Sequence, residues 1–118
     1  MNIKFRAKSV TYTEALGGDI VQFSFEENPD DDPLNPSSRN VSASISYEFP
    51  PCELSFEWCD GAEYGGGLKI KKYILTESIF HIYLEDDSEI EVSHSASAPT
   101  FKRIDALLLK ELGSRRNA

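Results

Sequence analysis

The stretch that most constrains the fold is residues 52–58, in which apolar and polar side chains alternate without a break in the order Cys-Glu-Leu-Ser-Phe-Glu-Trp. Period-two alternation places all the apolar side chains on one face of an extended chain, so the stretch predicts a half-buried strand. Asp60 and Gly61 end this strand, and Tyr64 then precedes three glycines at 65–67. We expect at least one of the three to have a positive φ, and an alanine to be tolerated where φ is ordinary.

Further alternating stretches predict strands at residues 3–12, 20–26, 41–49, 68–75, 79–84 and 89–94. Aligning apolar faces pairs Ile45 with Phe56 across a four-residue turn, and Ile82 with Val92 across a second hairpin. The same alignment pairs Tyr47 with Leu54 and Leu84 with Ile90.

Residues 100–112 predict a helix, because their apolar side chains recur at three- and four-residue spacing. Pro99 suits its first turn and Gly113 suits its end. The expected fold is therefore α+β: a mostly antiparallel, curved β-sheet of about seven strands with one C-terminal helix packed on it. The expected core includes Ile45, Phe56, Trp58, Ile82, Val92, Phe101, Ile104 and Leu108.

The chain of 118 residues suits a single globular domain, which we place at residues 1–113. Three prolines and a run of acidic residues predict a mobile loop at 27–39 within it, and residues 114–118 a disordered tail. A calcium site at Asp30, Asp31 and Asp32 is disfavoured, because calcium loops alternate their ligands and carry a glycine and a closing glutamate.

The net charge of −8 is concentrated in one part of the chain. Residues 19–63 contain eleven acidic side chains and a single basic one, Arg39. Such a surface repels phosphates and anionic lipids, so neither nucleic acid nor a membrane is an expected partner. A basic protein is the expected partner, although solubility alone also accounts for acidity. The chain start lacks the apolar segment of a signal peptide, which favours the cytoplasm.

No catalytic motif, cofactor motif or metal-ligand spacing is present, so we expect a protein that is not an enzyme. Cys52 and Cys59 lie on one predicted strand, too far apart for a disulfide, and Cys52 is expected to pack as a small apolar residue. A Cys59–His81 pair stays open as the alternative of a small enzyme.

Carboxylates gather on the outer face of the predicted central hairpin, where Glu48 lies opposite Glu53 and Glu57 follows. Like charges gain nothing from this proximity, so the cluster indicates a contact surface for a basic partner. The alternative is neutralisation within the fold by Lys69, Lys71 or Lys72. The predicted partner-binding residues are Glu48, Glu53, Glu57, Asp60, Glu63 and Tyr64, the last as an aromatic anchor.

Four features of the chain occur together: the segment Leu54-Ser-Phe-Glu-Trp58, the sequence Tyr64-Gly65-Gly66, the strands that follow and the closing helix. In these features the chain resembles the immunity protein 10 family of bacterial polymorphic-toxin systems. The likeness covers residues 41–112. It implies a cytoplasmic α+β protein without catalytic activity that binds and neutralises a cognate toxin domain. The alternative is a general interaction or adaptor domain without a toxin partner.

Overall fold

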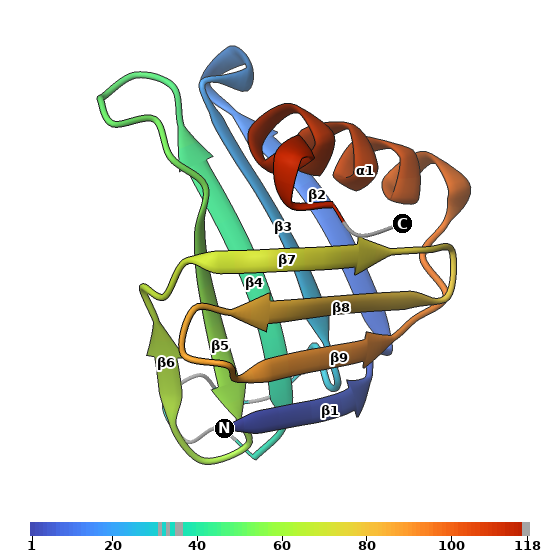
Figure 1. The fold of residues 1–118 in the computed structure, drawn as a ribbon. Coiled ribbons are helices and arrows are strands. Elements are labelled where there is room, and N and C mark those ends of the chain that lie inside the picture. The colour runs from blue at the N-terminus through green and yellow to red at the C-terminus, as the bar shows by residue number, and fades with distance from the viewer. Residues whose placement is uncertain (31, 33, 35–36, 117–118) are drawn as a thin grey trace.

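The computed structural model describes residues 1–30, 32, 34 and 37–116. Over these residues the chain forms nine strands and one α-helix, arranged as two sheets that pack face to face (Figure 1). The strands of one sheet cross those of the other, and the helix α1 lies beside β7 in the same layer as the smaller sheet. The expected α+β class with a packed C-terminal helix is confirmed, with more strands than expected and in two sheets.

The larger sheet is antiparallel and contributes one apolar face to the core. Its strand order is β2 (Ser9–Ala15), β3 (Ile20–Glu26), β4 (Arg39–Ser46), β5 (Ser55–Asp60) and β6 (Tyr64–Gly66). The buried side chains on its inner face alternate with polar ones on its outer face, as the period of an extended strand requires. A short 3-10 turn, η1 (Leu16–Gly18), connects β2 to β3.

The smaller sheet has the order β1 (Asn2–Arg6), β9 (Glu89–Ser93), β8 (Ile79–Leu84) and β7 (Ile70–Leu75). β1 pairs parallel to β9, and the other pairings are antiparallel.

The predicted strand at residues 3–12 is divided between the two sheets. Ala7 N donates to Ser93 O in the smaller sheet at 2.8 Å, and Lys8 N donates to Glu26 O in the larger sheet at 2.8 Å. The chain therefore changes sheets at this point. Alternation cannot reveal such a crossing, because Ile3, Phe5 and Ala7 stay buried up to it.

The helix α1 (Ala98–Leu112) begins where the Ser97 hydroxyl accepts a hydrogen bond from Thr100 N at 3.4 Å. Its expected apolar stripe is buried, with Phe101 only half-buried at one end. The other seven side chains expected in the core are all buried. Gly113 follows the helix with an ordinary φ of −53° and opens a second 3-10 turn, η2 (Gly113–Arg115).

The expected pairing of β4 with β5 is wrong by two residues, because Ala43, not Ile45, lies opposite Phe56. Both registers put the same side chains inside, so the apolar pattern could not distinguish them. The connection is correspondingly longer than a four-residue turn. Glu48 and Glu53 lie in this connection, so they do not face each other across a ladder.

The predicted β8–β9 register is also wrong by two residues. Ile82 lies opposite Ile90, and Leu84 N donates to Ser88 O at 2.8 Å across a tighter turn. Asp87 adopts a positive φ of 67° in this turn, a conformation that aspartate tolerates better than most residues.

In β7, whose register the sequence leaves open, a bulge between Ile70 and Lys72 leaves the consecutive side chains of Lys71 and Lys72 both exposed.

The two cysteines do not share a strand, contrary to expectation. Cys52 is half-buried in the β4–β5 connection with a φ of 54°, and its Sγ donates to Phe49 O at 3.4 Å. Cys59 is fully buried in β5. Both are free thiols.

The ends of the predicted acidic loop are tied together. Arg39 pairs with Glu27 at 2.5 Å and donates to Lys4 O at 2.6 Å. The predictions of a mobile loop and of a calcium alternative fall partly on residues 31, 33, 35 and 36, outside the described residues. Beyond the helix, Arg116 forms a β-bridge with Tyr73 and lies 3.7 Å from Asp105, whereas residues 117–118 of the predicted tail are not described.

Candidate protein-binding surface

The six predicted binding residues are all exposed and run from the β4–β5 connection, which holds Glu48 and Glu53, along β5 to the β5–β6 turn and the start of β6. Five of them form an elongated strip, which we call the acidic strip: Glu48, Glu53, Glu57, Asp60 and Glu63. Because β5 alone spans about 20 Å at ~3.3 Å per residue, the strip is a line of charges and not a compact cluster. Such an arrangement matches an extended protein contact better than a small ligand.

Glu57 lies at the middle of the strip without an opposing charge. Its neighbours across the ladder are Ser42 on β4 and Gly66 on β6. Among the residues that the structure describes, Glu48, Glu53, Glu57 and Glu63 form no ion pair within 4.0 Å. The like-charge repulsion expected across the hairpin is therefore absent, and these carboxylates stay open to an external partner.

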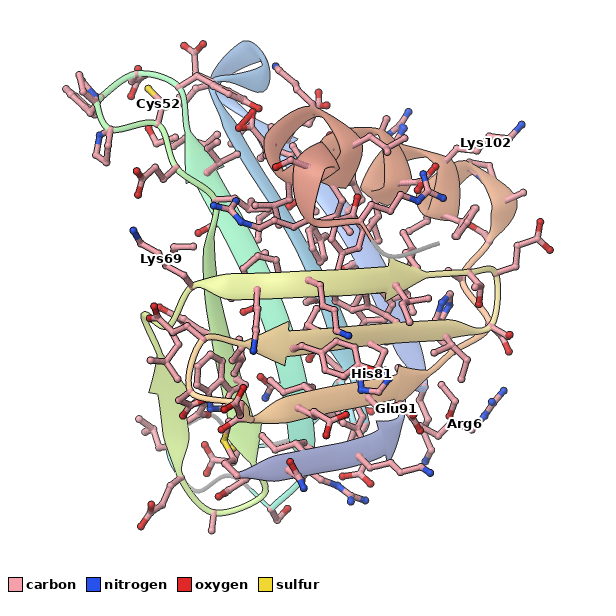
Figure 2. The ribbon with its side chains drawn as sticks, in the orientation of Figure 1. Arg6, Cys52, Lys69, His81, Glu91 and Lys102 are labelled. Carbon is pink, nitrogen blue, oxygen red and sulfur yellow. The ribbon has the colours of Figure 1, made fainter. Side chains whose placement is uncertain are left out.

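Two of the three lysines proposed to neutralise the acidic strip contact other residues instead. Lys71 pairs with Asp87 at 3.0 Å, and the Lys72 ammonium lies 4.4 Å from the centre of the Tyr83 ring. Both interactions belong to the smaller sheet. Lys69 lies on the link into β7 (Figure 2) and lines a cleft with Glu53, but the two form no ion pair. Neutralisation by Lys71 and Lys72 is therefore wrong.

Asp60 has a structural role that the sequence analysis missed. Its Oδ1 accepts hydrogen bonds from Ala62 N at 2.9 Å and Glu63 N at 2.8 Å, closing the β5–β6 turn. These backbone donors, that of Glu63 first, lower the pKa of the Asp60 carboxyl. Asp followed by Gly marks such a turn in a sequence, so the signal was present.

The glycines after Tyr64 have separate roles. Gly67 has a φ of 82°, which confirms the predicted positive φ. Gly65 has no such constraint, but a Cβ there would lie 2.5 Å from Trp58 Nε1. Trp58 is buried on the paired strand, and its indole occupies the space that a side chain at 65 would need. The expectation that alanine is tolerated at an ordinary φ is therefore wrong for Gly65.

We expect Gly65→Ala to destabilise the fold by about 1–3 kcal/mol, since the buried indole must shift to relieve the overlap. Denaturant unfolding followed by Trp58 fluorescence measures this change and reports the indole environment directly. Gly113→Ala is the control, because its φ is −53° and no atom lies within 4 Å of its Cβ, so little loss of stability is expected. Equal stability of Gly65→Ala and the unmodified chain would contradict the tight Trp58–Gly65 contact.

A cleft of about 390 Å³ opens at the upper end of the acidic strip, between the start of β5, the link into β7 and the end of α1. Its apolar walls include Leu54, Phe56 and Leu68, and its charged groups are Glu53, Lys69, Glu111 and Arg115. Apolar walls with charges of both signs suit an amphipathic side chain of a protein partner. A shallower depression along β6 includes Glu57 and Tyr64.

The Cys59–His81 alternative is not supported by position. His81 lies on the outer face of the smaller sheet near Glu91 (Figure 2), with its Nε2 at 3.0 Å from Glu89 Oε1 and its ring stacked on Tyr83 at 4.3 Å. Cys59 belongs to the larger sheet, so the two cannot act together. Within the described ranges, no group of three His, Cys, Asp or Glu side chains is arranged to hold a metal ion.

His94 is buried in the core, with only 2% of its surface exposed. Its Nδ1 accepts from Ala96 N at 3.1 Å, so in the neutral ring Nε2 carries the proton and donates to Thr76 O at 3.0 Å. Burial lowers the pKa of His94, because the imidazolium would lose its hydration. Its role is therefore structural.

We expect the free energy of unfolding to fall as the pH drops through about 6.5, the pKa of an unfolded-state histidine. The unfolded chain then binds a proton that buried His94 resists, so stability present at neutral pH is lost towards acid. Urea unfolding between about pH 8 and pH 5 measures the slope. His94→Asn should show a shallower decrease in this window, and an identical slope would assign the pH dependence to other groups.

Comparisons with known proteins return no family model, curated protein or solved structure that matches this chain. The resemblance to the immunity protein 10 family therefore stays a prediction. Among the described residues, α1 is the longest helix, and none is long and apolar enough to cross a bilayer.

Proposed function

We propose that this protein is a cytoplasmic immunity protein that binds and neutralises a basic toxin domain through the acidic strip, without catalysing a reaction. The observation that carries this proposal is the set of exposed carboxylates from the β4–β5 connection to the β5–β6 turn, of which Glu48, Glu53, Glu57 and Glu63 form no ion pair among the described residues. A fold gains no stability from such a line of like charges, so a basic partner accounts for their position.

The distribution of charge over the fold supports a partner of this kind. Residues 40–66, which contain the whole strip, include no Lys or Arg. Apart from Arg39 at the start of β4, which pairs with Glu27, the basic side chains are found on β1, β7 and α1 and in the segments beside them. A one-signed surface raises the association rate for a partner of opposite sign.

Co-expression tests the proposed function directly. Candidate toxin domains are taken from the genes next to this one, each is expressed in a bacterial host with and without this chain, and growth is measured. We expect the chain to restore growth against one of these domains and to co-purify with that domain. Continued growth arrest despite a soluble, folded chain would reject the immunity function.

Charge reversal tests the role of the strip. We expect Glu53→Lys with Glu57→Lys to lower the association rate for that toxin domain by about 10–100-fold at low salt, because steering is lost. Added salt should slow association of the unmodified chain but not that of the double variant. Stopped-flow kinetics measures both, with Glu77→Lys in the exposed turn between β7 and β8 as the charge-reversal control. An unchanged association rate at low salt would exclude the strip from the contact.

A further inference from the structure

Phe49 has a position that the core of this protein does not explain. It ends an alternating stretch whose other large apolar residues face inward, yet 70% of its surface is exposed. Pro50 and Pro51 beside it are exposed as well. Isolated exposed apolar side chains are common in proteins, so the surroundings of Phe49 decide whether it has a role.

A second exposed apolar side chain lies at the same end of the larger sheet. Leu16 in η1 is 63% exposed and has a φ of 52°, an unfavourable conformation for leucine. Figure 1 shows η1 and the β4–β5 connection together at this end. Tyr47 N donates to Asp19 O at 2.7 Å, which ties the two segments to each other.

The connection that carries Phe49, residues 47–54, is braced at its base. The Tyr47 hydroxyl donates to Glu111 Oε1 at 3.1 Å, and the Lys110 ammonium lies 4.4 Å from the centre of the Tyr47 ring. On the other side of the turn, Cys52 N donates to Phe49 O at 3.3 Å. A side chain presented on a braced segment loses less conformational entropy when it is buried by a partner.

The charges around this end identify the kind of partner. Exposed carboxylates flank the two apolar side chains in both segments, namely Glu14, Asp19, Glu48 and Glu53. Neither segment contains Lys or Arg, and the Lys110 ammonium of α1 reaches only the base of residues 47–54, at the Tyr47 ring. A second copy of this chain that docked through the same end, or an anionic membrane, would bring like charges together there. A basic protein surface with an apolar pocket is complementary to both the charge and the exposed aromatic ring.

We propose that Phe49, with Leu16 at the same end of the larger sheet, is the apolar anchor that inserts into a pocket on the basic toxin domain. This proposal rests on the proposed function and adds a division of roles. The acidic strip accelerates encounter, whereas Phe49 slows dissociation once the aromatic ring is buried. Aromatic anchors surrounded by polar groups commonly provide most of the binding energy of an interface.

The test uses the toxin domain that the co-expression experiment identifies, and binding kinetics are measured with one protein immobilised on a surface. Phe49→Ala should raise the dissociation rate by about thirty-fold or more and leave the association rate within about threefold. Phe49→Trp, which keeps an aromatic ring, should retain slow dissociation. The matched control is Leu109→Ala, which truncates a 43% exposed apolar side chain on α1.

The possible results separate the two proposals. If Phe49→Ala dissociates like Leu109→Ala while the double Glu→Lys variant still associates slowly, the anchor is rejected and the proposed function stands. If the unmodified chain neither binds nor protects, both are rejected. Two other results would also overturn the proposed anchor. If sedimentation shows a homodimer that the Phe49→Ala substitution dissociates, Phe49 belongs to the dimer contact. If the protein binds anionic vesicles through Phe49, the side chain belongs to a membrane contact.

Discussion

Replacing Phe23 with alanine is expected to reduce the free energy of unfolding by about 3–5 kcal/mol. Phe23 is fully buried on β3, and its ring centre lies 6.0–6.1 Å from those of Phe25, Phe56 and Phe80 in edge-on arrangements. Phe80 belongs to the smaller sheet, so Phe23 joins the two layers. Truncation leaves a cavity between the sheets and removes three aromatic contacts.

Chemical denaturation followed by far-ultraviolet circular dichroism measures this loss. Phe49→Ala is the matched control, since the same atoms are removed from an exposed position and the expected change is within about 0.5 kcal/mol. Equal effects of the two substitutions would show that the aromatic cluster does not hold the sheets together.

Replacing Leu108 with alanine is expected to cost about 2–5 kcal/mol. Leu108 is fully buried on the inner face of α1 together with Ile104, where the helix covers the part of the larger sheet that the smaller sheet leaves open (Figure 1). The adjacent residue provides the control, because Leu109 points outward and alanine is favourable in a helix. Leu109→Ala should change stability by no more than about 0.5 kcal/mol.

Thermal and urea unfolding of the two variants, side by side, measures the difference. A Leu108→Ala protein as stable as the Leu109→Ala protein would mean that α1 does not complete the core.

Three residues of the acidic strip show how much of the candidate site the sequence predicted. Glu57 lies on the outer face of β5 as the alternation predicted. Glu48 and Glu53, expected to oppose each other on paired strands, lie instead in the connection between those strands. The exposed carboxylates were therefore identified correctly, but their mutual geometry was not. The sequence did not identify Phe49 as a surface residue, because the alternation of apolar and polar side chains continues beyond Ser46, the last residue of β4.

The sequence by itself determined which side chains face inward, because the two-residue period of a strand and the 3.6-residue period of a helix are local properties of the backbone. It therefore predicted the helix stripe, the inner faces of β3, β4 and β5, and a positive φ among the glycines after Tyr64, which Gly67 adopts. The tertiary structure decided the register of both hairpins, since a slip of two residues leaves every side chain on the same face. It also decided where the chain crosses from β1 to β2, because the hydrogen bonds of Ala7 and Lys8 to different sheets depend on residues more than ten positions away in the sequence.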